Sequence, residues 1–425
     1  MKYYILNHMS QKEKISLFRR GRAEVSKAEE TVRPIIERVR VEGDKAVKEF
    51  TERFDGAKIE EIRVSWEEIE GAEKKISREL VEALETAAEN IAEFHRRQLP
   101  EEFSLNDNGR ELGVIFRAIP RIGCYIPGGR AVYPSTVLMT AIPARVAGVR
   151  HIAVATPPGR DGEINPLILA ACKIAGVTRV YRMGGAQAIA AFAYGTESID
   201  RVDKIVGPGN IYVTSAKRLM SSEVAVDMPA GPSEILIIAD ERADARVIAY
   251  DLLAQAEHDP DATCILITTS ETIGEDVRKI LEDKNLAERE EAYLSLEKNG
   301  AIIIADNVED AVNFSNSFAP EHLQIVTARN KELLEEIENA GSVFLGNYTP
   351  VASGDYASGT NHVLPTSGFA RAYSGLNIRS FLKIIFWQKL SKEGIKKLSK
   401  VIIPLAEAEG LKAHADSVKI RVKED

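Results

Sequence analysis

Four of the seven histidines lie in the C-terminal part of the chain, and each has an acidic or amide side chain close to it in sequence. Imidazole and carboxylate groups bind first-row metal ions, and they also transfer protons near neutral pH. These four segments therefore predict a metal site, a proton-transfer site, or both. They hold Gln255 and His258, Glu321 and His322, Asp355 and His362, and Glu409 and His414.

The segment that contains His258 is predicted to be a helix from Asp244 to His258. Gln255 and His258 are three residues apart, so both would project from one face near the end of this helix. A single histidine at this place could instead cap exposed carbonyl groups, which the helix dipole favours. Because three further histidine segments accompany it, we favour the interpretation as metal ligands.

Glu321 and His322 come just before an apolar strand, after Pro320. Adjacent residues at a strand edge point in different directions, so these two need not bind one metal ion. An acid and an imidazole at one site suit two successive proton transfers, with the histidine as base and the glutamate as activator of water. The alternative is that Glu321 caps a neighbouring element and His322 fills space, and both interpretations stay open.

Asp355 lies between two glycines in residues 347–377, a stretch rich in Gly, Ser, Thr, Asn and Pro. A loop of this length inside a compact protein is usually functional. Flexible backbone would let the carboxylate turn onto a metal ion, although a Gly-Asp pair is also typical of an Asx turn.

Residues 380–420 are predicted to be a polar, helical tail, on which Glu409 and His414 lie five residues apart. That separation places them about one helical turn apart without a strictly shared face. Taken alone, these two residues indicate an ordinary surface helix.

The composition is that of a globular protein of two to four domains, with 425 residues of which 44% are apolar and 28% charged. A net charge of -9 argues against a nucleic-acid partner, because no excess of Lys and Arg exists to displace counterions. The short basic run Phe18-Arg-Arg-Gly-Arg22 has acids nearby, so we interpret it as a solvated face. No stretch approaches the roughly 20 apolar residues that cross a bilayer. We expect no membrane partner and a cytoplasmic location.

The cysteines indicate neither a disulfide framework nor a thiolate metal site, because Cys124, Cys172 and Cys264 are odd in number and widely spaced. Any metal ion is therefore expected to have nitrogen and oxygen ligands. Cys124 as a thiol nucleophile is disfavoured, since no base adjoins it in sequence.

The pattern along the chain predicts an α/β fold with two Rossmann-like parallel-sheet domains, together with small helical N-terminal and C-terminal segments. Residues 1–100 are expected to be mostly helical, and residues 111–126 to form strand. Short β-branched strands then alternate with helices in two series, which is typical of βαβ units. The turn-rich residues 227–233 are predicted to connect the two series. The expected strands begin at His151, Arg179 and Lys204 in the first series and at Glu234, Cys264, Ala301, Leu323 and Ser342 in the second.

Three glycine-rich segments begin at Tyr125, Met183 and Val206, and the last two lie at expected strand-to-helix junctions. Amides at a helix N-terminus can hold a phosphate group there. None of the three is a G-x-G-x-x-G, so the usual dinucleotide fingerprint is missing and glycine for tight turns is the alternative.

Together these segments resemble the histidinol dehydrogenase family, which acts in the last step of histidine biosynthesis. The resemblance extends from about residue 110 to the end of the chain. The matching strings are Gly128-Gly-Arg-Ala-Val-Tyr-Pro-Ser, Met183-Gly-Gly-Ala-Gln-Ala-Ile, Lys204-Ile-Val-Gly-Pro-Gly-Asn, Met228-Pro-Ala-Gly-Pro-Ser-Glu, Leu252-Leu-Ala-Gln-Ala-Glu-His-Asp-Pro, Ala319-Pro-Glu-His-Leu, Gly354-Asp-Tyr, Asn361-His-Val-Leu-Pro-Thr and Glu409-Gly-Leu-Lys-Ala-His.

The resemblance implies a four-electron oxidation of L-histidinol to L-histidine through L-histidinaldehyde, with two NAD and one zinc ion per site. It implies His322 as general base and Glu321 as activator of water. The implied zinc ligands are Gln255, His258, Asp355 and His414, and the implied NAD contacts are Tyr125, Gln187 and Asn210. Substrate contacts would come from Ser233, His362 and Glu409, together with His322 and the zinc ligands.

The family also implies an intertwined homodimer, in which the tail of one chain completes the site of the other. The expected domains are a helical segment over residues 1–20, a larger α/β domain over 21–119 with 234–376 on the substrate and metal side, a second α/β domain over 120–233 on the NAD side, and a helical tail over 377–425. A zinc hydrolase and a metal-stabilised, non-catalytic nucleotide-binding regulator are the competing hypotheses.

Overall fold

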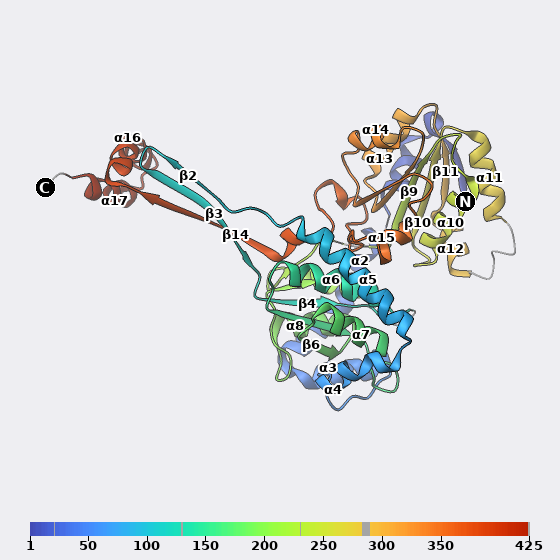
Figure 1. Ribbon diagram of the computed structural model, residues 1–425, viewed down its shortest axis with the longest axis horizontal. Coiled ribbons are helices and arrows are strands. Elements are labelled where there is room, and N and C mark those ends of the chain that lie inside the picture. The colour runs from blue at the N-terminus through green and yellow to red at the C-terminus, as the bar shows by residue number, and fades with distance from the viewer. Residues whose placement is uncertain (21, 129–130, 230, 283–289, 424–425) are drawn as a thin grey trace.

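Two parallel β-sheets and a long arm make up the protein, seen here in a computed structural model (Figure 1). The structure describes residues 1–20, 22–128, 131–229, 231–282 and 290–423. The arm projects away from both sheets, and the C-terminal helices lie at its tip (Figure 1). The two parallel sheets confirm the predicted fold class.

Within the described residues, the larger sheet has six parallel strands in the order β1-β11-β10-β9-β12-β13. If the strands are numbered along the chain from β9, the order β11-β10-β9-β12-β13 is the doubly wound order 3-2-1-4-5. Strands are added first on one side of β9 and then on the other, so the switch point lies between β9 and β12. The N-terminal strand extends one edge by pairing with β11. The strands are β1 (Lys2–Ile5), β9 (Glu234–Ala239), β10 (Thr263–Thr268), β11 (Ala301–Ile304), β12 (His322–Val326) and β13 (Ser342–Leu345).

Helices cover both faces of the larger sheet, which explains why its strands are almost continuously apolar. In β9, Ile235 and Ile237 pack into one core, while Leu236 and Ile238 pack into the core on the other face. The helices α10 (Ala245–Ala256), α11 (Glu271–Leu281) and α12 (Glu290–Asn299) cover the first face, and α13 (Val308–Phe318) and α14 (Asn330–Glu335) cover the second.

The smaller sheet has the same winding, with parallel strands in the order β6-β5-β4-β7-β8. Its strands are β4 (Arg121–Tyr125), β5 (His151–Thr156), β6 (Arg179–Arg182), β7 (Lys204–Val206) and β8 (Ala225–Val226). The helices between them are α6 (Pro134–Val146), α7 (Pro166–Ala175), α8 (Gly185–Tyr194) and α9 (Ile211–Met220). Residues 227–233 lead from β8 to β9 and so connect the two sheets as predicted, although Ala230 lies outside the described residues.

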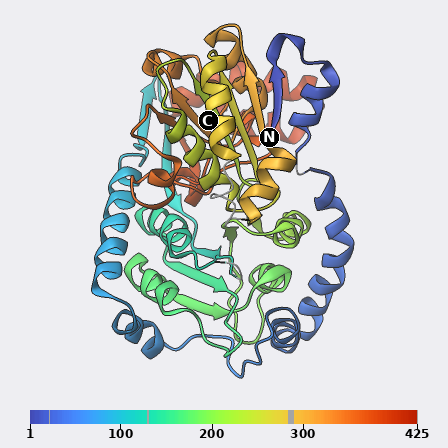
Figure 2. The same cartoon turned by 90° about the vertical axis from the view of Figure 1, so that its right-hand side faces the viewer.

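The N-terminal helices pack on the smaller sheet, which corrects the expected assignment of residues 21–119 to the larger domain. Apolar side chains of α2 such as Val32 and Val39 are buried with α8 and α9, whereas Leu84 and Ile91 of α5 are buried with α6 on the opposite face. The two long helices accordingly flank the smaller sheet in Figure 2. The helices that pack on the smaller sheet are α2 (Arg22–Glu42), α3 (Asp44–Asp55), α4 (Trp66–Gly71) and α5 (Arg78–Arg96), whereas α1 (Gln11–Phe18) packs on the larger sheet through Leu17 and Phe18. Residues 1–20 hold strand β1 as well as α1, so this segment is not purely helical.

The arm is a three-stranded antiparallel sheet in the order β14-β3-β2, which carries two helices at its end. The prediction of continuous helix from residue 380 is wrong over β14, which pairs along the full length of β3 and has the β-branched and aromatic run Ile384–Trp387 at its centre. The elements are β2 (Phe103–Asp107), β3 (Arg110–Ala118), β14 (Leu382–Leu390), α16 (Lys392–Ala408) and α17 (Lys412–Val422).

Residues 347–377 are less irregular than expected, because they contain α15 (Val351–Tyr356) and a short 3-10 helix at Phe369–Arg371. Further 3-10 helices span Leu6–His8, Ala72–Lys75 and Ile378–Phe381. Across the described ranges, no helix is both long enough and apolar enough to cross a membrane. The three cysteines are buried and free, as predicted.

Candidate active site

The candidate site lies at the amino-terminal edge of the larger sheet, where the adjacent parallel strands β9 and β12 begin. Glu234 is the first residue of β9 and His322 the first residue of β12, and His322 is opposite Ile235 in the strand register. This is the edge at which the connecting residues 227–233 arrive from the smaller sheet. The predicted pair Glu321 and His322 is therefore held by the sheet itself.

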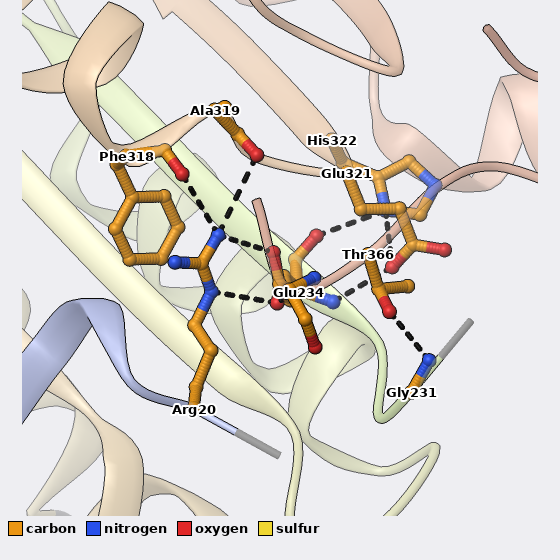
Figure 3. A network of polar contacts seen from close by, with 9 residues as sticks. Arg20, Gly231, Glu234, Phe318, Ala319, Glu321, His322 and Thr366 are labelled. Atoms are coloured by element: carbon orange, nitrogen blue, oxygen red, sulfur yellow. Dashed lines mark hydrogen bonds and ion pairs between the residues drawn. The ribbon is translucent and has the colours of Figure 1, made fainter. Parts of the chain in front are cut away.

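The ring orientation of His322 is fixed by a backbone group. Its Nδ1 lies 3.0 Å from the carbonyl oxygen of Glu234 (Figure 3). A carbonyl oxygen can only accept, so Nδ1 carries the proton and Nε2 keeps its lone pair. Nε2 is buried without a hydrogen-bond partner, and it lies 3.9 Å from Oδ1 of Asp355.

Burial also fixes the charge state of His322. Desolvation, together with the neighbouring imidazoles of His258 and His362, lowers the pKa of His322 to about 3. The ring is therefore neutral near pH 7, and its free nitrogen can accept a proton.

Glu321 is buried beside His322, with 5% of its surface exposed. Its Oε2 accepts a hydrogen bond of 2.7 Å from the backbone amide of Glu234 and lies 3.5 Å from Nδ1 of His322. Desolvation raises the pKa of Glu321 well above its ordinary value, and the carboxylates of Glu234 and Asp355 raise it further. The group is therefore suited to hold or accept a proton near neutral pH.

Gln255 and His258 come from the end of α10. Gln255 is in the helix, but His258 follows it, since α10 ends at Ala256, two residues earlier than predicted. The Gln255 side chain is buried, and neither of its amide atoms has a hydrogen-bond partner. His258 is exposed and lies near the rings of His322 and His362.

Asp355 lies on the short helix α15 and not in a flexible glycine loop. Burial raises the pKa of its carboxyl group to about 7. The backbone oxygen of Asp355 accepts a hydrogen bond of 2.9 Å from Nδ1 of His362, and Thr136 of α6 lies 3.3 Å from Nε2 of the same ring. His362 thus contacts a residue of the smaller domain, and Ser233 immediately precedes β9.

Glu409 and His414 are not brought to this site within one chain. Glu409 caps the end of α16, His414 lies on α17, and both are exposed at the tip of the arm (Figure 1). The two helices pack on each other, and α16 also contacts β14. The structure therefore separates these two residues from the other predicted site residues.

The remaining residues fit a metal ion that has nitrogen and oxygen ligands. Gln255 is the clearest sign, because a buried amide without partners is costly unless a ligand satisfies it. No three His, Cys, Asp or Glu side chains among the described residues form a metal-binding group. Of the four expected ligands, Gln255 is an amide and His414 is on the arm, so only His258 and Asp355 could contribute to such a group.

The predicted NAD contacts lie at the carboxyl-terminal edge of the smaller sheet, where doubly wound folds bind ligands. Tyr125 ends β4, and its hydroxyl accepts a 3.1 Å hydrogen bond from the amide of Gly185. Gln187 is buried in the first turn of α8 with both amide atoms unpartnered. Asn210 caps α9 by accepting hydrogen bonds from two backbone amides.

The loop before Asn210 is held by a buried ion pair between Lys217 and Asp227. Lys217 donates to the carbonyl of Gly207 at 2.9 Å, and Asp227 accepts from the amide of Gly207 at 2.7 Å. Gly207 has a φ of +115°, and a Cβ there would overlap the carbonyl oxygen of Tyr125. This close approach explains the glycine.

A cavity of about 660 Å³ opens at the carboxyl end of β5. Its walls include Thr156 and Pro157 at the end of β5 and Asp55 at the end of α3. Burial raises the pKa of Asp55 to about 6, and its Oδ2 has no hydrogen-bond partner. Gly129 and Arg130 of the first glycine-rich segment lie outside the described residues.

The sequence reasoning missed Glu234 and Arg20. Arg20 pairs with Glu234 through a 2.6 Å contact and is 8% exposed, so the interpretation of Phe18–Arg22 as a solvated face is wrong for Arg20. Glu234 did carry a signal, because it is the one charge in the apolar run Glu234–Ala239, which is buried throughout.

Two doubly wound sheets place the protein in the Rossmann-like α/β class, and its candidate site is a buried imidazole beside carboxylates. A family model described as histidinol dehydrogenase matches residues 18–422. The chain belongs to the histidinol dehydrogenase family.

Histidinol dehydrogenases from other organisms are similar in sequence to this chain over nearly its whole length. The histidinol dehydrogenase of Methanocaldococcus jannaschii is 52% identical over 421 residues, which cover 98% of each chain. That of Methanosarcina mazei is 51% identical over 98% of this chain and 96% of its own. The crystal structure of the enzyme from Elizabethkingia anophelis is 42% identical, covers 99% of this chain and 98% of its own, and superposes with a TM-score of 0.94.

Proposed function

We propose that this protein oxidises L-histidinol to L-histidine through L-histidinaldehyde and uses two NAD molecules in doing so. Its membership of the histidinol dehydrogenase family carries the proposal. The free Nε2 of a buried, neutral His322 supplies the base that such an oxidation needs. NAD accepts a hydride at each of the two oxidations.

His322 removes the proton of the substrate hydroxyl in the first step. The backbone oxygen of Glu234 keeps the proton on Nδ1, so Nε2 is the atom that accepts. Glu321 then takes a proton from the water that adds to the aldehyde. Its raised pKa makes the carboxylate, once ionised, a stronger base than an exposed glutamate. Burial of both groups keeps bulk water away from the bound aldehyde.

One zinc ion per site would be held by Gln255, His258 and Asp355 of one chain and by His414 of a second copy. The unpartnered amide of Gln255 supports this assignment. Zinc would bind the imidazole and amino groups of the substrate and so orient it. Ser233, His362 and Glu409 of the second copy would complete the substrate contacts.

Tyr125, Gln187 and Asn210 would bind NAD at the carboxyl-terminal edge of the smaller sheet. The doubly wound strand order and the unpartnered amide of Gln187 support this placement. This edge and the amino-terminal edge of the larger sheet are joined by residues 227–233, which would bring the nicotinamide toward His322.

The arm supports a homodimer with intertwined tails. A small sheet with apolar side chains on both faces is not stable alone in water, and it needs a partner surface. Ile384, Ile385 and Phe386 are consecutive in β14 and all exposed, the last by 78%. A second copy of the chain would cover them and receive His414. We expect no nucleic-acid or membrane partner and a cytoplasmic location.

The decisive experiment combines purified, zinc-loaded protein with L-histidinol and NAD. We expect about two NADH for each histidinol consumed, because both oxidations occur at one site. The absorbance of NADH and chromatographic measurement of histidine give the ratio. Absence of NADH formation would exclude the proposed function and leave a zinc hydrolase as the alternative, while any turnover excludes a purely regulatory protein.

A further inference from the structure

We propose that the ion pair between Arg20 and Glu234 positions His322 and Glu321 for catalysis. Neither of the two side chains belongs to the predicted substrate, zinc or NAD contacts. The inference rests on the proposed function where it concerns turnover, and it adds a positioning role for a residue from the N-terminal segment.

The pair is buried and has bidentate geometry. Nε and one terminal nitrogen of Arg20 donate to the two carboxylate oxygens of Glu234 at 2.6 and 2.8 Å. The side chains are 8% and 1% exposed, so water screens the pair little. Two parallel charge-assisted hydrogen bonds fix direction as well as distance.

Arg20 also binds the segment that leads to the catalytic pair. The terminal nitrogen that contacts Glu234 donates to the carbonyl oxygen of Phe318 at 3.0 Å, and the guanidinium carbon lies 3.4 Å from the centre of the Phe318 ring. The next residue, Ala319, has a left-handed φ of +53°, which is uncommon without glycine and needs such support. Arg20 thus bridges Phe318 at the end of α13 and Glu234 at the start of β9.

The backbone of Glu234 forms hydrogen bonds with both catalytic residues. Its amide donates to Oε2 of Glu321 at 2.7 Å, and its carbonyl oxygen accepts from Nδ1 of His322 at 3.0 Å (Figure 3). Its side chain also accepts from the amide of Ser367 at 2.7 Å. A shift of Glu234 would therefore move the base and the water-activating acid together.

The alternative is that the pair only stabilises the fold. A buried ion pair is often replaceable without loss of stability, whereas removal of one partner leaves an unpaired buried charge. The two possibilities differ in one respect. A positioning pair must affect kcat in enzyme that is fully folded.

The test uses Arg20→Lys, which keeps the charge but not the fork, together with Arg20→Met and Glu234→Gln. Arg38→Met is the control for loss of a bidentate Arg–Glu pair far from the site. Arg38, on α2, donates to Glu42 at 2.8 and 2.9 Å, lies over the ring of Phe50 on α3, and is 39% exposed. We expect kcat to fall about 10-fold for Arg20→Lys and about 100-fold for Arg20→Met, since small misplacements of catalytic groups cost this much. KM for NAD should change less than about twofold, because its predicted contacts are on the other domain. Arg38→Met should keep the parental kcat.

Circular dichroism and calorimetry give the folded fraction of each variant. If Arg20→Met does not fold, Arg20→Lys and Glu234→Gln decide alone. A loss of kcat that matches only the loss of folded protein, or an Arg20→Lys variant with the parental kcat, would overturn the positioning role.

A second measurement is independent of turnover. Protein labelled with ¹⁵N-histidine should show a slowly exchanging Nδ1–H signal of His322, assigned by its loss in His322→Gln. We expect Arg20→Lys to shift this signal and to speed its exchange, while Arg38→Met leaves it unchanged. An unaltered signal in Arg20→Lys contradicts the proposal. Failure of the parent to oxidise histidinol would reject the proposed function but leave this measurement decisive for the positioning.

Discussion

Nδ1 of His322 lies 3.0 Å from the backbone carbonyl oxygen of Glu234, the first residue of the neighbouring strand. The contact leaves Nε2 as the only nitrogen of the ring that can accept a proton. Because the partner is a backbone atom of a buried parallel sheet, ring orientation and tautomer are set by the fold and do not depend on a mobile side chain. A general base needs this arrangement before substrate arrives.

Replacement of His322 by glutamine should lower kcat about 100- to 10,000-fold, the usual contribution of a positioned base. Binding should be affected much less, so isothermal titration with NAD should give a dissociation constant close to that of the parent. His151→Gln is the control, since His151 is exposed at the start of β5. Undiminished turnover in His322→Gln would show that another group takes the proton.

The two parallel sheets were predictable from the sequence because they depend on local patterns, whereas the roles of the site residues stay a prediction. Short apolar strands between helices predict βαβ units, and His322 and Glu321 were chosen by residue type and neighbourhood. Burial of β9 on both faces follows from its continuous Ile and Leu residues.

The packing of α2 to α5 and the arm were not predictable in the same way. An amphipathic helix shows that it must cover a sheet but not which sheet, so residues 21–119 were assigned to the wrong domain. β14 was expected to be helix because its partner β3 is far away in sequence, and only that long-range pairing stabilises the strand. Arg20 was interpreted as exposed for a related reason, since its partner Glu234 is 214 residues away.

The exposed position of His414 at the tip of the arm predicts that each site needs two chains. His322→Ala and His414→Ala protomers should each be inactive alone. After subunit exchange, about one quarter of the parental activity should return, because half of the dimers are mixed and each has one site without either mutation. Sedimentation or light scattering confirms that the chains remain dimeric. No recovery in verified mixed dimers would contradict the shared site.

The buried amide of Gln255 predicts that its replacement raises the stability of the metal-free protein and reduces the further stabilisation by zinc. In metal-free protein, Gln255→Leu should raise stability by about 1–3 kcal/mol, because it removes a buried polar group without partners. With zinc present the same variant should gain less from the metal than the parent does, since one ligand is missing. Thermal unfolding with chelator and with added zinc, together with elemental analysis of zinc, checks both signs. Equal zinc content and an equal shift of Tm on zinc addition would exclude Gln255 as a ligand.

The raised pKa of Asp55 predicts that the stability of the protein depends on pH through a group outside the catalytic site. Burial raises the pKa of Asp55 to about 6 in the folded protein, whereas the ordinary value in an unfolded chain is about 3.9. The fold therefore favours the protonated form, so this contribution to stability is fully present below about pH 4 and is lost as pH rises toward about 6.

Asp55→Asn keeps the side chain neutral at every pH, so it should stabilise the protein by about 1–3 kcal/mol at pH 8 relative to its effect at pH 4. Denaturant unfolding of parent and variant at both pH values measures this difference. Glu60→Gln removes one exposed carboxylate close by and controls for net charge. The stability difference between Asp55→Asn and the parent could instead be the same at pH 4 and pH 8. The pKa of Asp55 would then be equal in the folded and unfolded protein, which contradicts the prediction.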